Sequence, residues 1–101
     1  MDKYTQWKIQ ELKEKKMIEQ RGICAGCNKQ FRIGDITELA HILKQGKYTE
    51  SKYSKDIIQH ELNMKLTHSG YCNSSVQMNT NKTELVNEHI KMIEEVIGDE
   101  Q

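Results

Sequence analysis

The chain has 101 residues, of which 36% are hydrophobic and 30% charged, and its formal net charge is zero. So short and polar a chain predicts one small domain with a thin hydrophobic core, which commonly needs a staple such as a structural metal. No stretch approaches the roughly 18 consecutive apolar residues of a membrane-spanning helix, and the opening residues MDKYTQWKIQ lack the apolar run of a signal peptide. We therefore expect a cytoplasmic protein without a membrane partner.

Charge is distributed unevenly along the chain, although its sum is zero. Residues 83–101 carry one lysine and six acidic residues, whereas residues 41–82 carry six lysines and three acidic residues. The acidic residues of the C-terminal stretch cancel the positive charge of the middle of the chain in the sum. A partly basic surface is what binding to a nucleic-acid backbone requires. A nucleic-acid partner therefore stays open despite the zero net charge.

The first half of the chain predicts a helix, a strand and a loop, in that order. A loose apolar stripe with lysine–glutamate pairs on the other face predicts a helix over residues 3–20, and Gly22 suits its end. Apolar and β-branched residues predict a short strand over 35–43. Residues 44–56 are polar and rich in lysine, which predicts a loop with room for one helical turn.

The second half predicts another strand and two helices. Residues 63–68 alternate as a short strand does, residues 71–78 fit a short helix, and a one-sided apolar stripe predicts a long helix over 83–98. The expected fold class is therefore α+β. We treat residues 1–101 as one domain, with a core over about 20–82 between two terminal helices.

All three cysteines and one histidine have the spacing of a structural zinc site. Cys24 and Cys27 form a pair that lets one turn direct both sulfurs at one ion, and His68 with Cys72 can form the second pair. An odd number of cysteines fits a disulfide framework poorly. Two alternatives stay open: a redox-active pair at Cys24 and Cys27, and His60 in place of His68 as the fourth ligand.

Three further polar residues lie between and directly after these ligands. His41 stands in the apolar stretch LAHIL, Asn63 precedes the second expected strand, and Asn73 follows Cys72. Taken alone, His41 also fits a buried, hydrogen-bonded side chain, Asn63 a turn residue, and Asn73 a helix N-cap or Asx turn.

Taken together, this order resembles the HNH nucleases, whose fold is the ββα-metal motif. The resemblance covers about residues 20–82 and rests on GICAGC, ELAHIL, the tyrosine-containing basic loop, IIQHELN and YCNSSVQMN. It is closest to the small zinc-stapled members that phages, mobile elements and bacterial defence loci encode. The resemblance implies a ββα-metal core with a zinc knuckle, flanked here by the two terminal helices, and a DNA endonuclease activity.

The resemblance also implies a role for each of the three polar residues. His41 matches the general base, which takes a proton from the water that attacks the phosphorus. Asn63 matches the mainly structural asparagine, whose amide hydrogen-bonds the loop between the strands. Asn73 matches the last position of the motif and would ligate a catalytic Mg²⁺ or Mn²⁺ beside the structural Zn²⁺.

The sequence departs from the family pattern at Ala40, because many HNH proteins carry Asp or His directly before the catalytic histidine. Water, Glu38 or Gln77 would then have to complete the coordination of the ion, and His60 could approach the substrate phosphate. Ala40 also keeps an alternative open: a zinc-stabilised DNA- or protein-binding module with little or no nuclease activity.

The remaining candidates concern partners. The loop after His41 interleaves lysines with two tyrosines, which suits contact with the DNA backbone, although such runs are often simply solvated. These residues are Lys44, Lys47, Lys52 and Lys55, with Tyr48 and Tyr53. The terminal helices could form a homodimer through the long apolar face over 85–97, beside which we expect His89 to be a packing or surface residue.

Overall fold

The structure is a computed structural model that describes residues 6–79 and 81–100, and it divides into two compact units. The first unit contains residues 6–40 and Lys65–Val76, and the second contains His41–Met64 with residues 77–79 and 81–100. Each unit has buried apolar side chains of its own. The units are described separately below.

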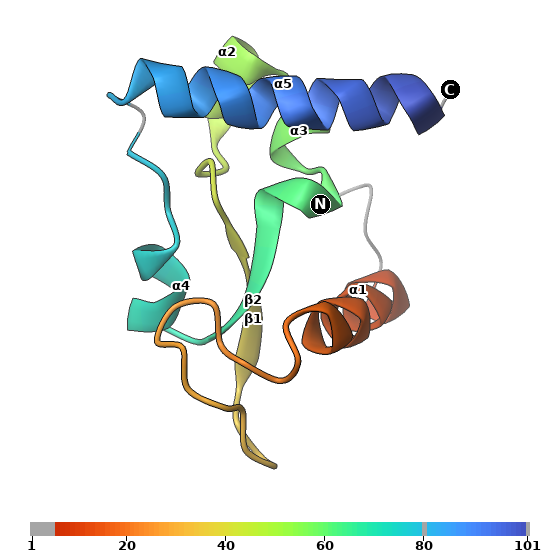
Figure 1. Ribbon diagram of the computed structural model, residues 1–101, viewed down its shortest axis with the longest axis vertical. Helices are drawn as coiled ribbons and strands as arrows, with labels where there is room; N and C mark the ends of the chain where they lie inside the picture. Colours follow the sequence, from red (N-terminus) through yellow and green to blue (C-terminus); the bar gives the residue numbers. More distant parts are fainter. Residues whose placement is uncertain (1–5, 80, 101) are drawn as a thin grey trace. The chain divides into compact units, whose positions relative to one another are not determined.

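The described residues form an α+β fold, which confirms the predicted class. The chain runs through α1 (Gln6–Glu19), β1 (Thr37–His41), α2 (Lys47–Tyr53), α3 (Lys55–Ile58), the 3₁₀ turn η1 (Glu61–Asn63), β2 (Met64–His68), α4 (Tyr71–Ser75) and α5 (Thr83–Glu100) (Figure 1). The strands β1 and β2 pair as a two-stranded antiparallel sheet. Both strands fall within the ranges that the sequence predicted.

Helix α1 belongs to the first unit and begins at Gln6; residues 3–5 of the expected helix lie outside the described residues. Its stripe is loose, because Leu12 is buried whereas Trp7 and Ile18 are exposed. Beyond the helix, the backbone N–H of Gly22 donates to the Met17 carbonyl at 2.9 Å, and Gly22 has φ +73°. A left-handed glycine after the last turn is a common way for a helix to end.

The side chain of Gln20, one residue past α1, joins this end of the helix to β2. Its Nε2 donates to the carbonyl oxygens of Ile23 and Leu66, each at 2.9 Å, and its Oε1 accepts from the Leu66 N–H at 2.8 Å. Both backbone polar groups of Leu66 are therefore satisfied by one side-chain amide. The backbone N–H of Ala25 adds a second donor to the Leu66 carbonyl at 3.1 Å.

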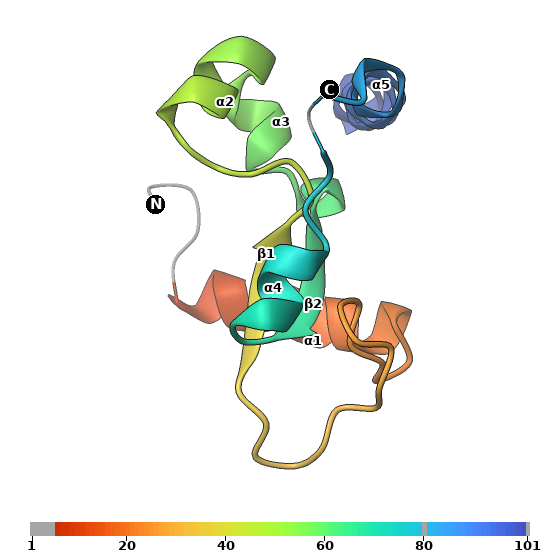
Figure 2. The same ribbon diagram turned by 90° about the vertical axis from the view of Figure 1, so that its left-hand side faces the viewer.

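In the second unit, the loop expected over 44–56 is wrong in large part, because the segment forms α2 and begins α3 (Figure 2). The cause is tertiary: Tyr53 of α2 packs against the core, and Ile57 and Ile58 of α3, directly after this range, are buried. Ser54 caps α3, since its Oγ accepts from the Ile57 N–H at 3.4 Å. Polar composition alone does not reveal this arrangement.

The core of the second unit consists of Leu43, Ile58 and Val86, with partly buried side chains from α2, α5 and the segment before α5 packed around it. The apolar face predicted for α5 is confirmed in part: Ile93 is buried and Ile90 is partly buried, whereas Leu85 is exposed and its neighbour Val86 is buried instead. The helix extends to Glu100, two residues beyond its expected end, and α4 ends at Ser75 instead of 78.

Among the helices of residues 6–79 and 81–100, none combines the length and the apolar character that crossing a membrane would require.

Candidate metal centre

Four potential metal ligands of the first unit come from three separate places in the chain. Cys24 and Cys27 lie in a tight turn closed by the antiparallel bridge between Ile23 and Gln30. His68 is the last residue of β2, and Cys72 lies in the first turn of α4. The turn is held internally, because the Cys24 N–H donates to the Lys29 carbonyl at 2.9 Å and the Asn28 N–H donates to the Cys24 carbonyl at 2.9 Å.

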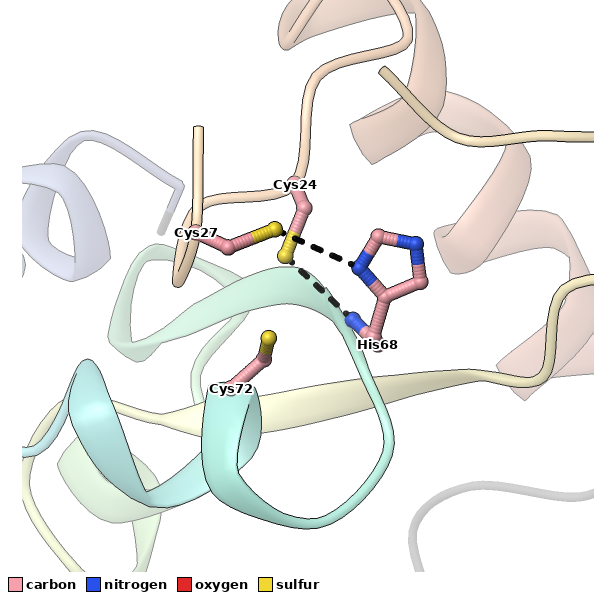
Figure 3. Close-up of side chains that lie close together, drawn as sticks. All are labelled: Cys24, Cys27, His68 and Cys72. Atoms are coloured by element: carbon pink, nitrogen blue, oxygen red, sulfur yellow. Dashed lines mark hydrogen bonds between the residues drawn. The ribbon is translucent and has the colours of Figure 1, made fainter. Parts of the chain in front are cut away.

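The candidate ligand atoms of these four residues all lie within 4.8 Å of one another. Figure 3 shows the three sulfurs and the Nδ1 face of the imidazole directed at one common space. Sulfurs that share a tetrahedral zinc at about 2.3 Å are roughly 3.8 Å apart, so small adjustments would suffice for coordination. The Cys3His group can therefore hold a metal ion, and its donors are those of structural zinc sites.

His68 is oriented for coordination through Nδ1. That nitrogen lies 3.6 Å from the Cys27 sulfur, whereas Nε2 lies 2.9 Å from Oδ2 of Asp35. The Phe31 ring packs beside the imidazole with its centroid 4.8 Å away. Metal-binding histidines commonly give their second N–H to a carboxylate, which fixes the ring and its tautomer. Asp35 has this position here, and the sequence analysis did not identify it.

The charges in this group change with metal binding. Hydrogen bonding to Asp35 raises the pKa of His68 to about 9 in the metal-free chain. Burial acts to raise the pKa of Cys24, but the backbone N–H groups of Cys27, His68 and Gly26 outweigh it and lower the pKa to about 6. Burial, with the neighbouring Cys24 and Cys27, raises the pKa of Cys72 to about 11. Three thiols this close resist full ionisation, and a cation removes that conflict while it displaces the His68 proton.

Gly26 lies between the two cysteines of the turn because no side chain fits there. A Cβ on Gly26 would lie 2.5 Å from the Cys72 carbonyl oxygen and 2.8 Å from its Cα. Both neighbours are backbone atoms, which cannot rotate away. The close approach of the turn to α4 therefore depends on glycine, a requirement visible only once Cys72 is known to face this turn.

His60, the alternative fourth ligand, belongs to the second unit and is not part of the group. It is buried, and its Nδ1 accepts a hydrogen bond from the Leu62 N–H at 3.1 Å. That contact caps the 3₁₀ turn η1. The structure thus favours His68 over His60 as the ligand.

Asn63 is fully buried in the second unit and makes four side-chain hydrogen bonds. Its Oδ1 accepts from the Leu43 N–H at 2.8 Å and from Nε2 of His89 at 3.0 Å. Its Nδ2 donates to the carbonyl oxygens of Leu43 at 3.0 Å and Ile58 at 2.9 Å. The amide therefore ties together the two ends of the segment that connects β1 to β2. His89, expected to be only a packing or surface residue, is a donor in this network.

His41 ends β1 and is half-buried in the second unit. Its Nε2 lies 3.3 Å from Oε1 of Gln59, which is itself buried. Burial lowers the pKa of His41, although the Gln59 contact and the negative charge of Glu50 act in the opposite direction. The imidazole is therefore neutral at neutral pH, the state in which one ring nitrogen can accept a proton.

Asn73 and Glu38 lie together in the first unit. Nδ2 of Asn73 donates to Oε1 of Glu38 at 3.0 Å, which leaves the amide oxygen of Asn73 and the second carboxylate oxygen as potential ligands. Ala40 is fully buried. Gln77, the other residue considered for this ion, is exposed and belongs to the second unit.

The four lysines considered for DNA contact are all exposed in the second unit: Lys44, Lys47, Lys52 and Lys55. The ammonium group of Lys52 lies over two aromatic rings, 5.8 Å from the centroid of Tyr48 and 5.3 Å from that of Tyr53. These contacts present a cation and two tyrosines on one short helix.

Comparison of the chain with protein-family models, with curated proteins and with solved structures gives no match.

Proposed function

We propose that this protein is a zinc-stapled, metal-dependent DNA endonuclease of the HNH type. The observation that carries the proposal is the environment of Asn63. The resemblance requires an asparagine whose amide holds the segment between the two strands, and Asn63 is buried with hydrogen bonds to the Leu43 and Ile58 backbone. A turn residue exposed to solvent would not have this set of partners.

Zinc is the metal we assign to the Cys3His group, with a structural role. Three thiolates and one imidazole would supply all four ligands of a zinc ion and leave none to be supplied by substrate, as is typical of structural zinc. The orientation of His68 by Asp35 supports the assignment, because it directs Nδ1 toward the sulfurs. An ion of this kind stabilises a small unit that buries few large apolar side chains.

His41 is the general base in this proposal. A base needs a neutral ring nitrogen near neutral pH, and the lowered pKa of His41 supplies it. The base takes a proton from water while the water oxygen attacks the phosphorus. The bond between the phosphorus and the 3′ oxygen breaks, and the 3′ oxygen leaves. The Gln59 contact holds the His41 ring, and the half-buried side chain stays partly accessible.

Glu38 and Asn73 are the residues we assign to a second, catalytic ion. Their side chains already contact each other at 3.0 Å, and carboxylate and amide oxygens are ligands that Mg²⁺ and Mn²⁺ prefer. When bound, such an ion supplies charge stabilisation at the phosphate and the leaving oxygen. In this role Glu38 replaces the carboxylate or imidazole that many family members carry at the position of Ala40.

DNA contact is assigned to the lysines of α2 and its neighbours. Exposed ammonium groups bind phosphate without reading the base sequence, and the exposed ring of Tyr48 beside Lys52 adds aromatic surface. Binding should weaken steeply as the salt concentration rises, because each phosphate contact releases counterions.

The test is a nicking assay on supercoiled plasmid with Mg²⁺, Mn²⁺ or Ni²⁺. We expect metal-dependent nicking by the wild type and a loss of at least about 100-fold in the His41→Ala and Asn73→Ala variants. Zinc content and circular dichroism of each variant serve as controls for folding. Absence of nicking with every ion, or equal nicking by His41→Ala, would overturn the nuclease proposal.

The burial of Ala40 favours one second candidate, a zinc-stabilised DNA- or protein-binding module without cleavage. The position expected to carry a metal ligand is here part of the core. The same assay separates the two functions: a binding module retards DNA in a gel or captures a protein partner, and leaves the plasmid supercoiled with every ion.

A further inference from the structure

The surroundings of His41 contain a chain of hydrogen bonds that the proposed reaction does not require in itself. Gln59 lies directly after α3, is 3% exposed, and bridges His41 to two other side chains. Its Oε1 lies 3.3 Å from Nε2 of His41, and its Nε2 donates to Oε1 of Glu50 at 2.9 Å and to Oε1 of Gln45 at 3.2 Å. All four residues belong to the second unit.

The charge of Glu50 determines which way the Gln59 amide points. An ionised carboxylate accepts hydrogen bonds and donates none, so the NH₂ group of Gln59 has to face Glu50. The carbonyl oxygen of Gln59 then faces His41. If the amide turned over, its oxygen would face the carboxylate, and a buried polar pair would be left unbonded.

The direction of the amide in turn determines the tautomer of His41. A carbonyl oxygen only accepts, so Nε2 of His41 must carry the hydrogen, and in the neutral ring Nδ1 then carries the lone pair. We infer that Gln59, held by Glu50, is a positioning residue that fixes His41 in the Nε2–H tautomer and so reserves Nδ1 as the proton acceptor. The consequence of this tautomer for catalysis rests on the proposed nuclease function, whereas the assignment of the tautomer does not depend on that function.

The backbone supports this relay from several sides. His41 is at the end of β1, Glu50 is within α2, and Gln59 caps α3 with its N–H donating to the Lys55 carbonyl at 2.9 Å. Three elements therefore meet at one amide. The burial of Gln59 excludes most competing water, which makes its orientation depend on these partners.

The test measures the tautomer directly, by long-range proton–nitrogen NMR of the full-length zinc-loaded protein at pH 8. The ¹⁵N shifts distinguish a protonated ring nitrogen from an unprotonated one, and loss of the signal in His41→Ala assigns it among the four histidines. We expect His41 of the wild type to carry its proton on Nε2 alone. A wild-type ring with the proton on Nδ1, or evenly shared, would overturn the inference.

The sharpest variant pair is Glu50→Gln against Glu50→Asp. Glu50→Gln keeps the shape but adds a donor, which permits the Gln59 amide to turn over, so both tautomers of His41 should appear. Glu50→Asp keeps an acceptor-only partner and should retain the Nε2–H tautomer. Gln59→Leu should give a tautomer mixture, and Gln10→Leu on the exposed face of α1 should change nothing. An unchanged His41 spectrum in both Glu50→Gln and Gln59→Leu would refute the relay.

Activity gives a second, separate readout. If the nuclease proposal holds, Glu50→Gln and Gln59→Leu should lower kcat in proportion to the share of Nε2–H tautomer that they lose, about 2-fold for an even mixture, with little change in KM, and Glu50→Asp should recover most of it. If the wild type shows no nicking while the NMR result is as expected, the nuclease proposal fails and the tautomer assignment stands. If nicking is normal but the tautomer is wrong, only the relay fails.

Discussion

The two units hold their polar side chains in opposite ways. In the first unit, three thiols and an imidazole lie within 4.8 Å of one another, an arrangement that resists full ionisation of the thiols until a cation binds. In the second, Asn63 and Gln59 have their polar atoms bonded to other parts of the same chain. The comparison indicates that order in the first group depends on a ligand, whereas order in the second is intrinsic.

Removing a zinc ligand should have the largest effect on stability, and it should destabilise the first unit more than the second. In Cys72→Ser we expect loss of zinc and of on the order of 10 kcal/mol of metal-linked folding free energy. Hydrogen exchange provides the measurement: the Ala25 N–H, bonded to Leu66, should lose protection, whereas the Leu43 N–H, bonded to Asn63, should keep more of it. Cys72→His offers a matched control, because imidazole is also a zinc ligand and should retain the ion.

Equal loss of protection at both amides would show that the units unfold together. Retention of zinc by Cys72→Ser would contradict the assignment of Cys72 as a ligand.

Asn63→Ala should destabilise the second unit and leave the stability of the first unit unchanged. It leaves the Leu43 N–H and two buried carbonyl groups without their partner, so the free energy of unfolding should fall by about 2–4 kcal/mol. Urea titration measures the loss. Asn87→Ala, at an exposed position of α5, should change stability by less than about 0.5 kcal/mol. A comparably small effect of Asn63→Ala would mean that the network contributes little.

Gly26→Ala should act on the first unit through shape alone. The added Cβ would meet the Cys72 backbone at 2.5 Å, so the turn and α4 must move apart, at a cost of about 1–3 kcal/mol. Thermal unfolding with and without a chelator should show the cost mainly in the metal-loaded state. Gly98→Ala adds its Cβ to open space on α5 and should stabilise by about 0.5–1 kcal/mol. Equal zinc affinity in Gly26→Ala and wild type would disprove the steric requirement.

Asp35→Asn should weaken the metal site without abolishing it. A neutral amide holds the His68 ring less firmly, and we expect zinc affinity to fall about 10- to 100-fold, as measured by competition with a chromophoric chelator. Asp99→Asn on the exposed end of α5 removes the same charge without touching the site. The contact would have no role in binding if the two variants held zinc equally well.

The smallest expected effect is a shift in the pH profile of nicking. A general base works when it is neutral, so nicking activity should be lost as pH falls through the pKa of His41. Burial lowers this pKa, so the acidic limb of the pH profile should lie below the ordinary histidine value of 6.5. Glu50→Gln removes a negative charge that raises this pKa, so its limb should lie lower still. The measurement is kcat/KM across pH 5–8, and a wild-type limb above 6.5 would contradict the burial argument.

The sequence predicted most accurately those features that require a characteristic spacing of residues along the chain. Cys24, Cys27, His68 and Cys72 could be grouped because zinc requires paired ligands on short turns, and the structure brings these four together. The helices and strands of the first unit and α5 were placed to within a few residues, since their apolar periodicity is local. These predictions needed no knowledge of tertiary contacts.

Features that depend on contacts between distant residues were missed. Asp35 lies 33 positions before its partner His68, and an isolated aspartate in a turn has no characteristic spacing. The donor role of His89 toward Asn63 spans 26 positions. We predicted a loop over 44–56 because its residues are polar, whereas Tyr53 of α2 packs against the core and the buried Ile57 and Ile58 follow in α3. Gly26 gave no signal by itself, because its steric requirement depends on the Cys72 backbone, 46 positions later.

The bond between Gln20 and Leu66 has a consequence for how the protein behaves at high concentration. A two-stranded sheet has open edges, and an exposed edge invites another chain to add a strand. At Leu66 the side-chain amide of Gln20 occupies the backbone N–H and C=O that an incoming strand would use. Gln20 and the Ala25 N–H together oppose strand addition at Leu66, and we expect Gln20→Leu, which frees the Leu66 N–H, to self-associate at lower concentration than the wild type.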